Sequence, residues 1–312
     1  MSVNIRALSP ELQLIAKQEL HEESSQMPQM LEQFREWIKK SPHLKSRIDD
    51  QFLIMFLRGC KYSLERAKQK LDMYYTVRTH APELVGKRDG LDARTLEILR
   101  LGVMIPISKS QPGGPLIIVV RPGSYDAEKF HIEEIIRVFM LINDLLLIEN
   151  DNITVAGSLS IIDLKNVTLG HLLQMQPSII KKMTMLSQEG SPIRQKGIHY
   201  VNTPPGFDKV FNIFVSFMNE KMKKRVFVHG NDMESLFKSG IPKDILPKEY
   251  GGECETIDAI VQHWEQKIKD NYERLVEDAK VYKVDERKRI GKTKNPENLF
   301  GVDGTFRKLE ID

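Results

Sequence analysis

The sequence predicts an α/β fold in which a helical N-terminal module precedes a domain built on a mostly parallel β-sheet. Residues 9–101 repeat apolar side chains at intervals of three and four, the spacing that places them on one face of a helix. After the turn at Pro112-Gly113-Gly114-Pro115, short β-branched runs alternate with longer helical stretches. Strands that alternate with helices form crossover units, and such units build parallel sheets.

The helical character of residues 9–101 follows from their interleaved apolar and charged side chains. Apolar residues recur at helical spacing within 31–38, 52–56 and 67–75. Ser63 precedes Leu64 in the manner of an N-cap, and Pro82 is expected to end the helix that starts there. We expect these residues to form a small all-helical module.

Residues 102–256 contain the alternation of strands and helices, and residues 257–312 form a third segment. The expected strands are 116–120, 155–164, 197–202 and 226–229. The expected helices are 132–148, 169–186 with an interruption at Pro177, 206–224 and 257–282. The polar tail that begins at Lys283 is expected to pack loosely.

The composition is that of an ordinary globular protein with balanced charge. With 41% hydrophobic and 29% charged residues, disorder is excluded, and a net charge of +3 from 46 basic and 43 acidic residues argues against nucleic acid as a partner. Cys60 and Cys254 cannot form a disulfide framework, and the N-terminus lacks the pattern of a secretion signal, so we expect a cytosolic protein. We also expect a monomer. No apolar run reaches the length of about 18 residues that a membrane span needs, so any membrane contact is expected to be peripheral and transient.

Sequence motifs of catalysis are missing, so we expect no enzyme, no cofactor and no metal. Gly291-Lys292-Thr293 resembles the end of a phosphate-binding loop, but Glu286 stands where that loop needs glycine. Dinucleotide, hydrolase and zinc motifs do not occur. Asp163, His199 and His229 are isolated polar residues in or beside strands, and a buried, hydrogen-bonded role is more common for such residues than catalysis.

The helix expected at 206–224 combines an apolar face with a basic end. Its apolar stripe consists of Phe207, Val210, Phe211, Phe214, Phe217 and Met218. The residues that follow are Lys221, Lys223, Lys224 and Arg225, which suit the negative end of a helix dipole and would also attract anionic headgroups. A core helix with a solvated basic end explains the same pattern, and both interpretations stay open.

The helices expected at 132–148 and 169–186 are too apolar for surface helices. Helices of this kind are buried in a core or line an apolar cavity, and methionines such as Met140 and Met183 suit an adaptable lining. Periodicity alone does not distinguish a cavity from a filled core.

Several stretches resemble the CRAL-TRIO lipid-binding family, and within it the branch of tocopherol, retinaldehyde and clavesin proteins. The N-terminal stretch is 50–58 with Tyr74-Tyr75 downstream, and 161–164 resembles the family's central strand. The stretch 192–199 leads through the gate helix to Lys221-Met222-Lys223-Lys224-Arg225, and 245–252 resembles the closing motif. The resemblance covers residues 30–267 and keeps the order and spacing of these motifs.

The resemblance implies a carrier with a hydrophobic cavity under a movable gate helix, formed by the stripe described above. It implies a cavity lined by Ile136, Phe139, Met140, Asn143, Ile161, Met183 and Leu186. It also implies a phosphoinositide-binding cleft formed by Arg194, Lys196, Lys221 and Arg225, with Cys60 where the tocopherol carrier has a further arginine. Phe139 and Asn143 replace two serines of the tocopherol pocket, so retinoids, carotenoids and other isoprenoids are candidate ligands beside tocopherol.

Two other functions remain as alternatives. A membrane adaptor would recognise phosphoinositides without an exchangeable ligand, and it predicts a filled cavity. An enzyme acting on lipids has less support, since no nucleophile is paired with a base in the sequence.

Overall fold

A computed structural model describes residues 3–86, 91–107 and 111–301 of the chain. Its N-terminal part is helical, as predicted. The helices are α1 (Pro10–Leu20), α2 (Met27–Lys39), α3 (Asp50–Gly59), α4 (Leu64–His80), α5 (Pro82–Val85) and α6 (Ala93–Arg100), with the short strand β1 (Leu44–Lys45) between α2 and α3. The Asp49 carboxylate caps α3 by accepting from the backbone N–H of Phe52, and α4 ends just before Pro82. Ser63 occupies the N-cap position of α4, but its side chain makes no capping hydrogen bond.

The central sheet confirms the predicted α/β class. Its strands are β2 (Met104–Pro106), β3 (Leu116–Val120), β4 (Ser158–Asp163), β5 (Gln195–Val201) and β6 (Val226–Gly230), in the order β2-β3-β4-β5-β6. The strands β3 to β6 run parallel, and β2 pairs antiparallel with β3 at the edge. Each parallel step is made by a chain segment that contains helix, which is the reason why the alternating pattern predicted a parallel sheet.

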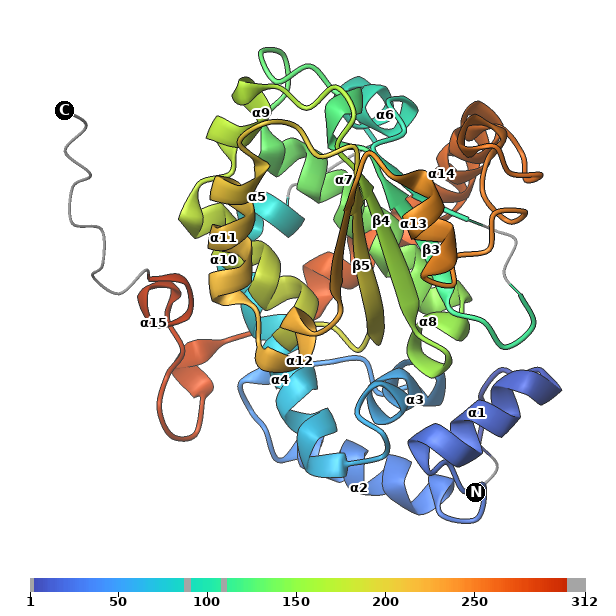
Figure 1. Ribbon diagram of the computed structural model, residues 1–312. Helices are drawn as coiled ribbons and strands as arrows, with labels where there is room; N and C mark the ends of the chain where they lie inside the picture. The colour runs from blue at the N-terminus through green and yellow to red at the C-terminus, as the bar shows by residue number, and fades with distance from the viewer. Residues whose placement is uncertain (1–2, 87–90, 108–110, 302–312) are drawn as a thin grey trace.

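The helices between and after the strands match the predicted ranges 132–148 and 169–186, the latter interrupted before Pro177, and depart from the prediction at 206–224. They are α7 (Ile132–Glu149), α8 (Asn152–Val155), α9 (Leu169–Gln174), α10 (Pro177–Thr184), α11 (Phe207–Phe217), α12 (Glu220–Lys223) and α13 (Met233–Lys238). The prediction of one helix over 206–224 was wrong, because the backbone leaves the helical region at Met218 (ψ 140°) and the Asn219 side chain caps α12. Helices α9, α10 and α11 lie on one side of the sheet, and α13 lies on the other (Figure 1).

Short helical turns complete these connections. A π-helical turn, η2 (Met185–Glu189), continues α10, and single 3-10 turns are η1 (Pro122–Ser124), η3 (Lys248–Tyr250) and η4 (Glu286–Lys288).

The C-terminal segment is packed against the rest of the molecule. Trp264 of α14 (Ile257–Val281) donates from its indole nitrogen to the Pro106 carbonyl oxygen at 3.2 Å, so this helix lies against the edge strand β2. Strand β7 (Lys283–Val284) pairs with β1, and α15 (Pro296–Phe300) follows. The Arg289 side chain, only 7% exposed, binds both carboxylate oxygens of Asp72 at 2.9 Å.

The prediction of a loosely packed tail was therefore wrong for residues 283–301, because buried ion pairs and a strand pairing hold them. The remainder of the predicted tail, 302–312, lies outside the described residues.

One continuous hydrophobic core joins the three segments. It includes Phe34 and Phe56 of the helical module, Ile118 and Leu145 around the sheet, and Ile268 of α14. In the described parts of the chain, no helix is both long and apolar enough to cross a bilayer.

Candidate functional site

A cavity of about 1060 Å³ lies between the sheet, α7, α10 and α11. The predicted lining residues Ile136, Phe139, Met140 and Asn143 face it from α7. Met183 of α10 and Leu186 of the following turn also line it. Helices α7 and α10 thus pack into the main core and also form a wall of the cavity.

Ile161 is the one predicted lining residue that lies elsewhere. Successive side chains of a strand point to opposite faces, and Ser160 and Ile162 of β4 line the cavity on either side of Ile161. Ile161 is 1% exposed and belongs to the main core. Assigning it to the cavity was wrong by one residue.

Helix α11 covers the cavity with its apolar stripe. Phe207, Val210, Phe211, Phe214 and Met218 line the cavity. Phe207 and Phe211 also pack on Tyr200 of β5, with ring centroids 5.3 and 5.5 Å from that tyrosine. Phe217, the last residue of α11, is absent from the lining, because at about 100° per residue it lies at the edge of the stripe that Phe207, Phe211 and Phe214 form.

The start of α11 is open. Gly206 precedes it with φ at 82°, a left-handed conformation that glycine adopts at little cost, and a Cβ atom there would meet no atom within 4 Å.

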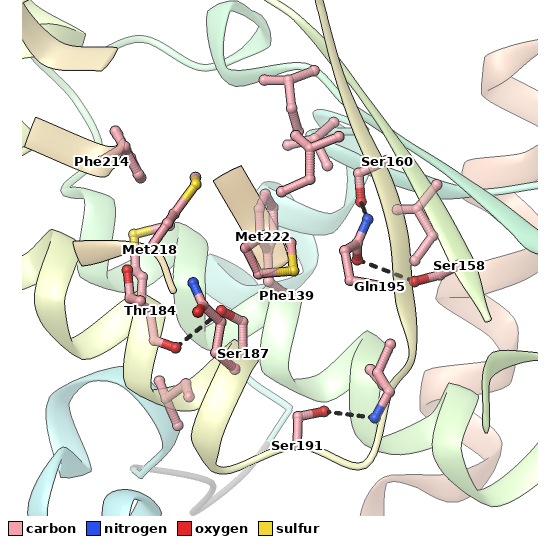
Figure 2. A pocket seen from close by; sticks show the side chains of 18 of the residues that line it. Phe139, Ser158, Ser160, Thr184, Ser187, Ser191, Gln195, Phe214, Met218 and Met222 are labelled. Atoms are coloured by element: carbon pink, nitrogen blue, oxygen red, sulfur yellow. Dashed lines mark hydrogen bonds between the residues drawn. The ribbon is translucent and has the colours of Figure 1, made fainter. Parts of the chain in front are cut away.

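The sheet side of the cavity has a polar end. Ser158 donates to the side-chain oxygen of Gln195 at 3.1 Å, and the Gln195 side-chain nitrogen donates to the Ser160 oxygen at 3.1 Å. Figure 2 shows these three residues as one hydrogen-bonded row beside Met222 and Phe139. None of the three was predicted from the sequence, because isolated serines and glutamines have no periodic pattern.

The four predicted cleft cations, Arg194, Lys196, Lys221 and Arg225, come together and line the same cavity. Arg225 donates to the backbone carbonyl of Gln195, and Arg194 donates to that of Val155. The pKa of Lys221 is lowered by burial and then by the charges of Arg225 and Arg194. Burial, followed by the charge of Arg194, also lowers the pKa of Arg225. The arrangement favours an anion, whose charge would relieve this repulsion.

Glycine permits the close approach that forms the cleft. Gly157 has φ at 99°, and a Cβ atom there would lie 2.4 Å from the Arg194 carbonyl oxygen. The backbone N–H of the next residue, Ser158, donates to that same oxygen at 2.9 Å. Any larger residue would push β4 away from the segment that bears Arg194 and Lys196.

Further cations reach the cleft from the helical module. Lys61, Arg66 and Lys70 line the cavity, and the charges of Arg66 and Lys61 contribute to the lowered pKa of Lys221. Cys60, at the C-cap of α3, is buried, and burial raises the pKa of its thiol. In the sequence, the one indication that the helical module supplies cations to the cleft is that Lys61 follows Cys60, the position of a cleft arginine in the tocopherol carrier.

A carboxylate occupies part of the cleft. Glu19 of α1 accepts from the Arg194 guanidinium and from the Lys196 ammonium, both at 2.9 Å. Its pKa is lowered, first by the hydrogen bond from Lys196. Two of the four predicted phosphoinositide ligands are therefore engaged by an internal anion.

The isolated candidates for catalysis have structural partners. The Asp163 carboxylate accepts from the Tyr250 hydroxyl at 2.6 Å and from the Asn202 amide at 2.7 Å. His199 and His229 stack with ring nitrogens 3.0 Å apart, and His199 lies on the sheet face opposite Ile198 and Tyr200, which line the cavity. Within the described residues no group of three His, Cys, Asp or Glu side chains could hold a metal ion.

Comparison with known proteins agrees with this architecture. The family model described as CRAL/TRIO domain matches residues 102–252, and one described as Pinta-like, UBA domain matches residues 23–95. A protein named alpha-tocopherol transfer protein-like from Homo sapiens is 33% identical over 254 residues, which cover 81% of this chain and 73% of that protein. Clavesin-2 from Homo sapiens is 29% identical over 246 residues, covering 78% of this chain and 75% of that protein.

Among solved structures, that of Sfh5 aligns with 85% of this chain and 99% of its own, at a TM-score of 0.48 and 16% identity. The long alignments to the curated relatives, together with the domain match over residues 102–252, identify the chain as a member of the CRAL-TRIO family, as its motifs predicted.

Proposed function

We propose that this protein is a cytosolic, non-enzymatic carrier of a small lipophilic molecule. The ligand, a tocopherol, retinoid, carotenoid or other isoprenoid, occupies the cavity under α11. The carrier exchanges it at membranes that contain phosphoinositides, which it contacts transiently as a monomer through the cationic cleft. Names of relatives such as alpha-tocopherol transfer protein-like support this class of ligand without deciding among its members.

The observation that favours a carrier most is the size and roof of the cavity. Its volume of about 1060 Å³ slightly exceeds the range of about 300–1,000 Å³ for small-molecule sites. A membrane adaptor without a ligand predicts a filled space, which this volume disfavours. An enzyme acting on lipids is disfavoured because Asp163, the polar residue at the end of β4, is already bonded to Tyr250 and Asn202.

The continuity between cleft and cavity supports a link between membrane contact and exchange. Lys221 and Arg225 follow α11 closely in sequence and line the same cavity as Phe214. A headgroup bound to these cations can favour an open α11 only if it binds more tightly to the open form than to the closed one. Because Lys221 and Arg225 lie within eight residues of the end of α11, a movement of this helix would also move the cations and so change their affinity for the headgroup.

Exposed leucines beside the cavity support a membrane-facing surface. Leu169 and Leu173 of α9 are each 69% exposed and lie one helical turn apart, while Leu172 between them lines the cavity. Apolar side chains this exposed gain free energy when they enter the boundary region of a bilayer. Helix α9 lies on the same side of the sheet as α11 (Figure 1), so both can contact one membrane.

The test of the cargo is native mass spectrometry of protein purified from its own source, followed by organic extraction. A carrier is expected to release one apolar molecule per chain. A protein that stays empty after incubation with retinoids, tocopherols, carotenoids and phospholipids would contradict the proposal and favour the adaptor.

The test of the cleft compares two double variants in a vesicle transfer assay. Lys221→Ala/Arg225→Ala removes cleft cations, whereas Lys223→Ala/Lys224→Ala removes the same charge from neighbours outside the cavity lining. A hydrogen bond to a charged phosphate contributes about 1.5 kcal/mol, so losing both cleft cations is expected to weaken binding to phosphoinositide vesicles about 150-fold. The control loses only the non-specific attraction to the anionic surface. The capacity of the cleft variant for ligand should be unchanged. Equal losses in both variants would contradict the cleft assignment.

A further inference from the structure

The loop between β7 and α15 presents one apolar side chain between cations. Ile290 is 77% exposed, more than any other large hydrophobic side chain in the described residues. Lys288, with a side chain that is 64% exposed, precedes it by two positions, and the exposed Lys292 follows it by two. Gly291 has φ at 94°, and a Cβ atom there would meet no atom within 4 Å. The tip of the loop therefore projects into solvent.

The base of the loop is held by ion pairs. Glu286 accepts from the Arg289 guanidinium at 2.6 Å and from the backbone N–H of Lys294 at 2.9 Å, so it joins the two ends of the loop. Arg289, whose side chain is 7% exposed, also binds Asp72 of α4 at 2.9 Å. The Lys294 ammonium binds the same carboxylate at 2.5 Å. The tip is thus presented by a fixed support, because folding it back would break these contacts.

The loop is close to the gate helix in the fold. Lys181 of α10 donates to the carbonyl oxygen of Gly301, just past α15, and the Lys182 ammonium lies 5.6 Å from the ring centroid of Phe300. Helix α10 also packs against α11. In Figure 1, α15 and the loop before it lie on the side of the molecule that bears α10 and α11. A flat surface that contacts α11 can therefore reach the loop as well.

The charge and shape of the tip fit an anionic lipid surface. Arg287, Lys288 and Lys292 carry three positive charges. Asp285 lies 2.9 Å from Arg287 and 3.8 Å from Lys288, so it offsets one of the three. A convex tip with a single apolar side chain offers no groove to a folded partner. At the boundary of a bilayer, Ile290 can enter the apolar region while the neighbouring cations meet lipid phosphates.

We propose that residues 287–292 form a second membrane-docking site, which recognises anionic lipid headgroups without the phosphoinositide cleft. Ile290 inserts between the headgroups, and Lys288 and Lys292 bind their phosphates. This inference rests on the proposed contact with membranes and deepens it. The cleft selects one headgroup, whereas the loop holds the α11 side of the protein against any anionic bilayer.

The first test is co-sedimentation with vesicles of phosphatidylserine and phosphatidylcholine that contain no phosphoinositide. Lys288→Gln/Lys292→Gln should bind about 30-fold more weakly than the wild type, as expected for the loss of two cations near an anionic surface. The control Lys238→Gln/Lys248→Gln removes the same charge from exposed positions, and α13, which carries Lys238, lies on the other side of the sheet (Figure 1). It should stay within twofold of the wild type, and equal losses in both variants would overturn the inference.

The second test places a fluorescent reporter at the tip. Ile290→Trp should gain blue-shifted emission on the same vesicles, and lipids brominated near the headgroup end of their acyl chains should quench it. The wild-type signal of Trp37 and Trp264 is subtracted. Adding Lys288→Gln/Lys292→Gln should remove both effects. An indole that is not quenched on vesicles to which the protein is bound would overturn the inference, and this outcome is expected if the loop contacts an acidic protein instead.

The two proposals fail in different ways. If the wild type binds vesicles that contain phosphoinositide but not those with phosphatidylserine alone, the docking loop is wrong and the proposed contact through the cleft stands. If the wild type binds neither kind of vesicle, the membrane contact of the proposed carrier is contradicted, and the docking loop with it.

Discussion

Removing the carboxylate of Glu19 is expected to strengthen binding to phosphoinositide membranes. Glu19 holds Arg194 and Lys196 through ion pairs of 2.9 Å, and a headgroup must displace it to use both cations. Its side chain is 46% exposed, so solvent screens both pairs and each contributes about 0.5 kcal/mol. Releasing about 1 kcal/mol in total corresponds to about fivefold tighter binding by Glu19→Gln.

Vesicle co-sedimentation with and without phosphoinositide measures this change. Glu11→Gln is the control, since it removes the same charge from the same helix and has no ion pair within the described residues. The gain of Glu19→Gln over this control should shrink at high salt, because exposed charges are then screened. Equal binding of the two variants at low salt would refute the competition between Glu19 and the headgroup.

Three further predictions concern the cavity, the histidine pair and the C-terminal segment. Met183→Trp places a larger side chain in the cavity and should reduce the amount of extractable ligand per chain without unfolding the protein. Burial and then the charge of His229 lower the pKa of His199 to about 4, so the folded state resists protonation. Stability should fall as pH drops from about 6.5 to about 4, by about 2 kcal/mol at pH 5, and His199→Gln should lose most of this dependence in urea unfolding. Asp72→Asn removes the carboxylate that the buried Arg289 shares with Lys294, leaves Glu286 as the remaining carboxylate partner of Arg289, and should cost about 3 kcal/mol in urea unfolding.

Each of these has an outcome that contradicts it. Unchanged ligand content in the Met183 variant would mean that the cargo does not lie beside α10. An identical pH dependence in the His199 variant would assign the acid sensitivity to other groups. The Asp72 variant is compared with Asp285→Asn, whose partner Arg287 is exposed, and equal losses would show that burial of the Arg289 pair adds nothing.

The fold was predictable because its signals are periodic and local. The alternation of apolar helices and β-branched runs determined the class, and Pro82 and Pro177 marked real helix boundaries. The break after Phe217 was missed because the apolar stripe continues into Met218, although Asn219 is a good N-cap residue and could have indicated it. The edge strand β2 was missed because three residues are too few to show a pattern.

The site residues that belong to family motifs, such as Arg194 and Lys221, were predictable from the sequence, and most of the others were not. Ile161 was assigned to the wrong face because a cavity wall was expected to be apolar, whereas the residues of β4 that alternate with Ile161 on the cavity face are Ser158, Ser160 and Ile162. Lys61 and Arg66 approach the cleft only through the packing of the helical module on the sheet, which sequence spacing does not encode. The row of Ser158, Gln195 and Ser160 depends on the register between two strands, and that register exists only in the folded chain.

The pairing of β1 with β7 has a consequence for how the chain folds during synthesis. Leu44 is synthesised 240 residues before its partner Val284. The ion pair of Asp72 with Arg289 has the same order of appearance. Strand β1 of the helical module therefore stays unpaired until β7 has been synthesised. Contacts between residues this far apart in the sequence slow folding. A chain stalled before residue 284 should be a preferred client of chaperones.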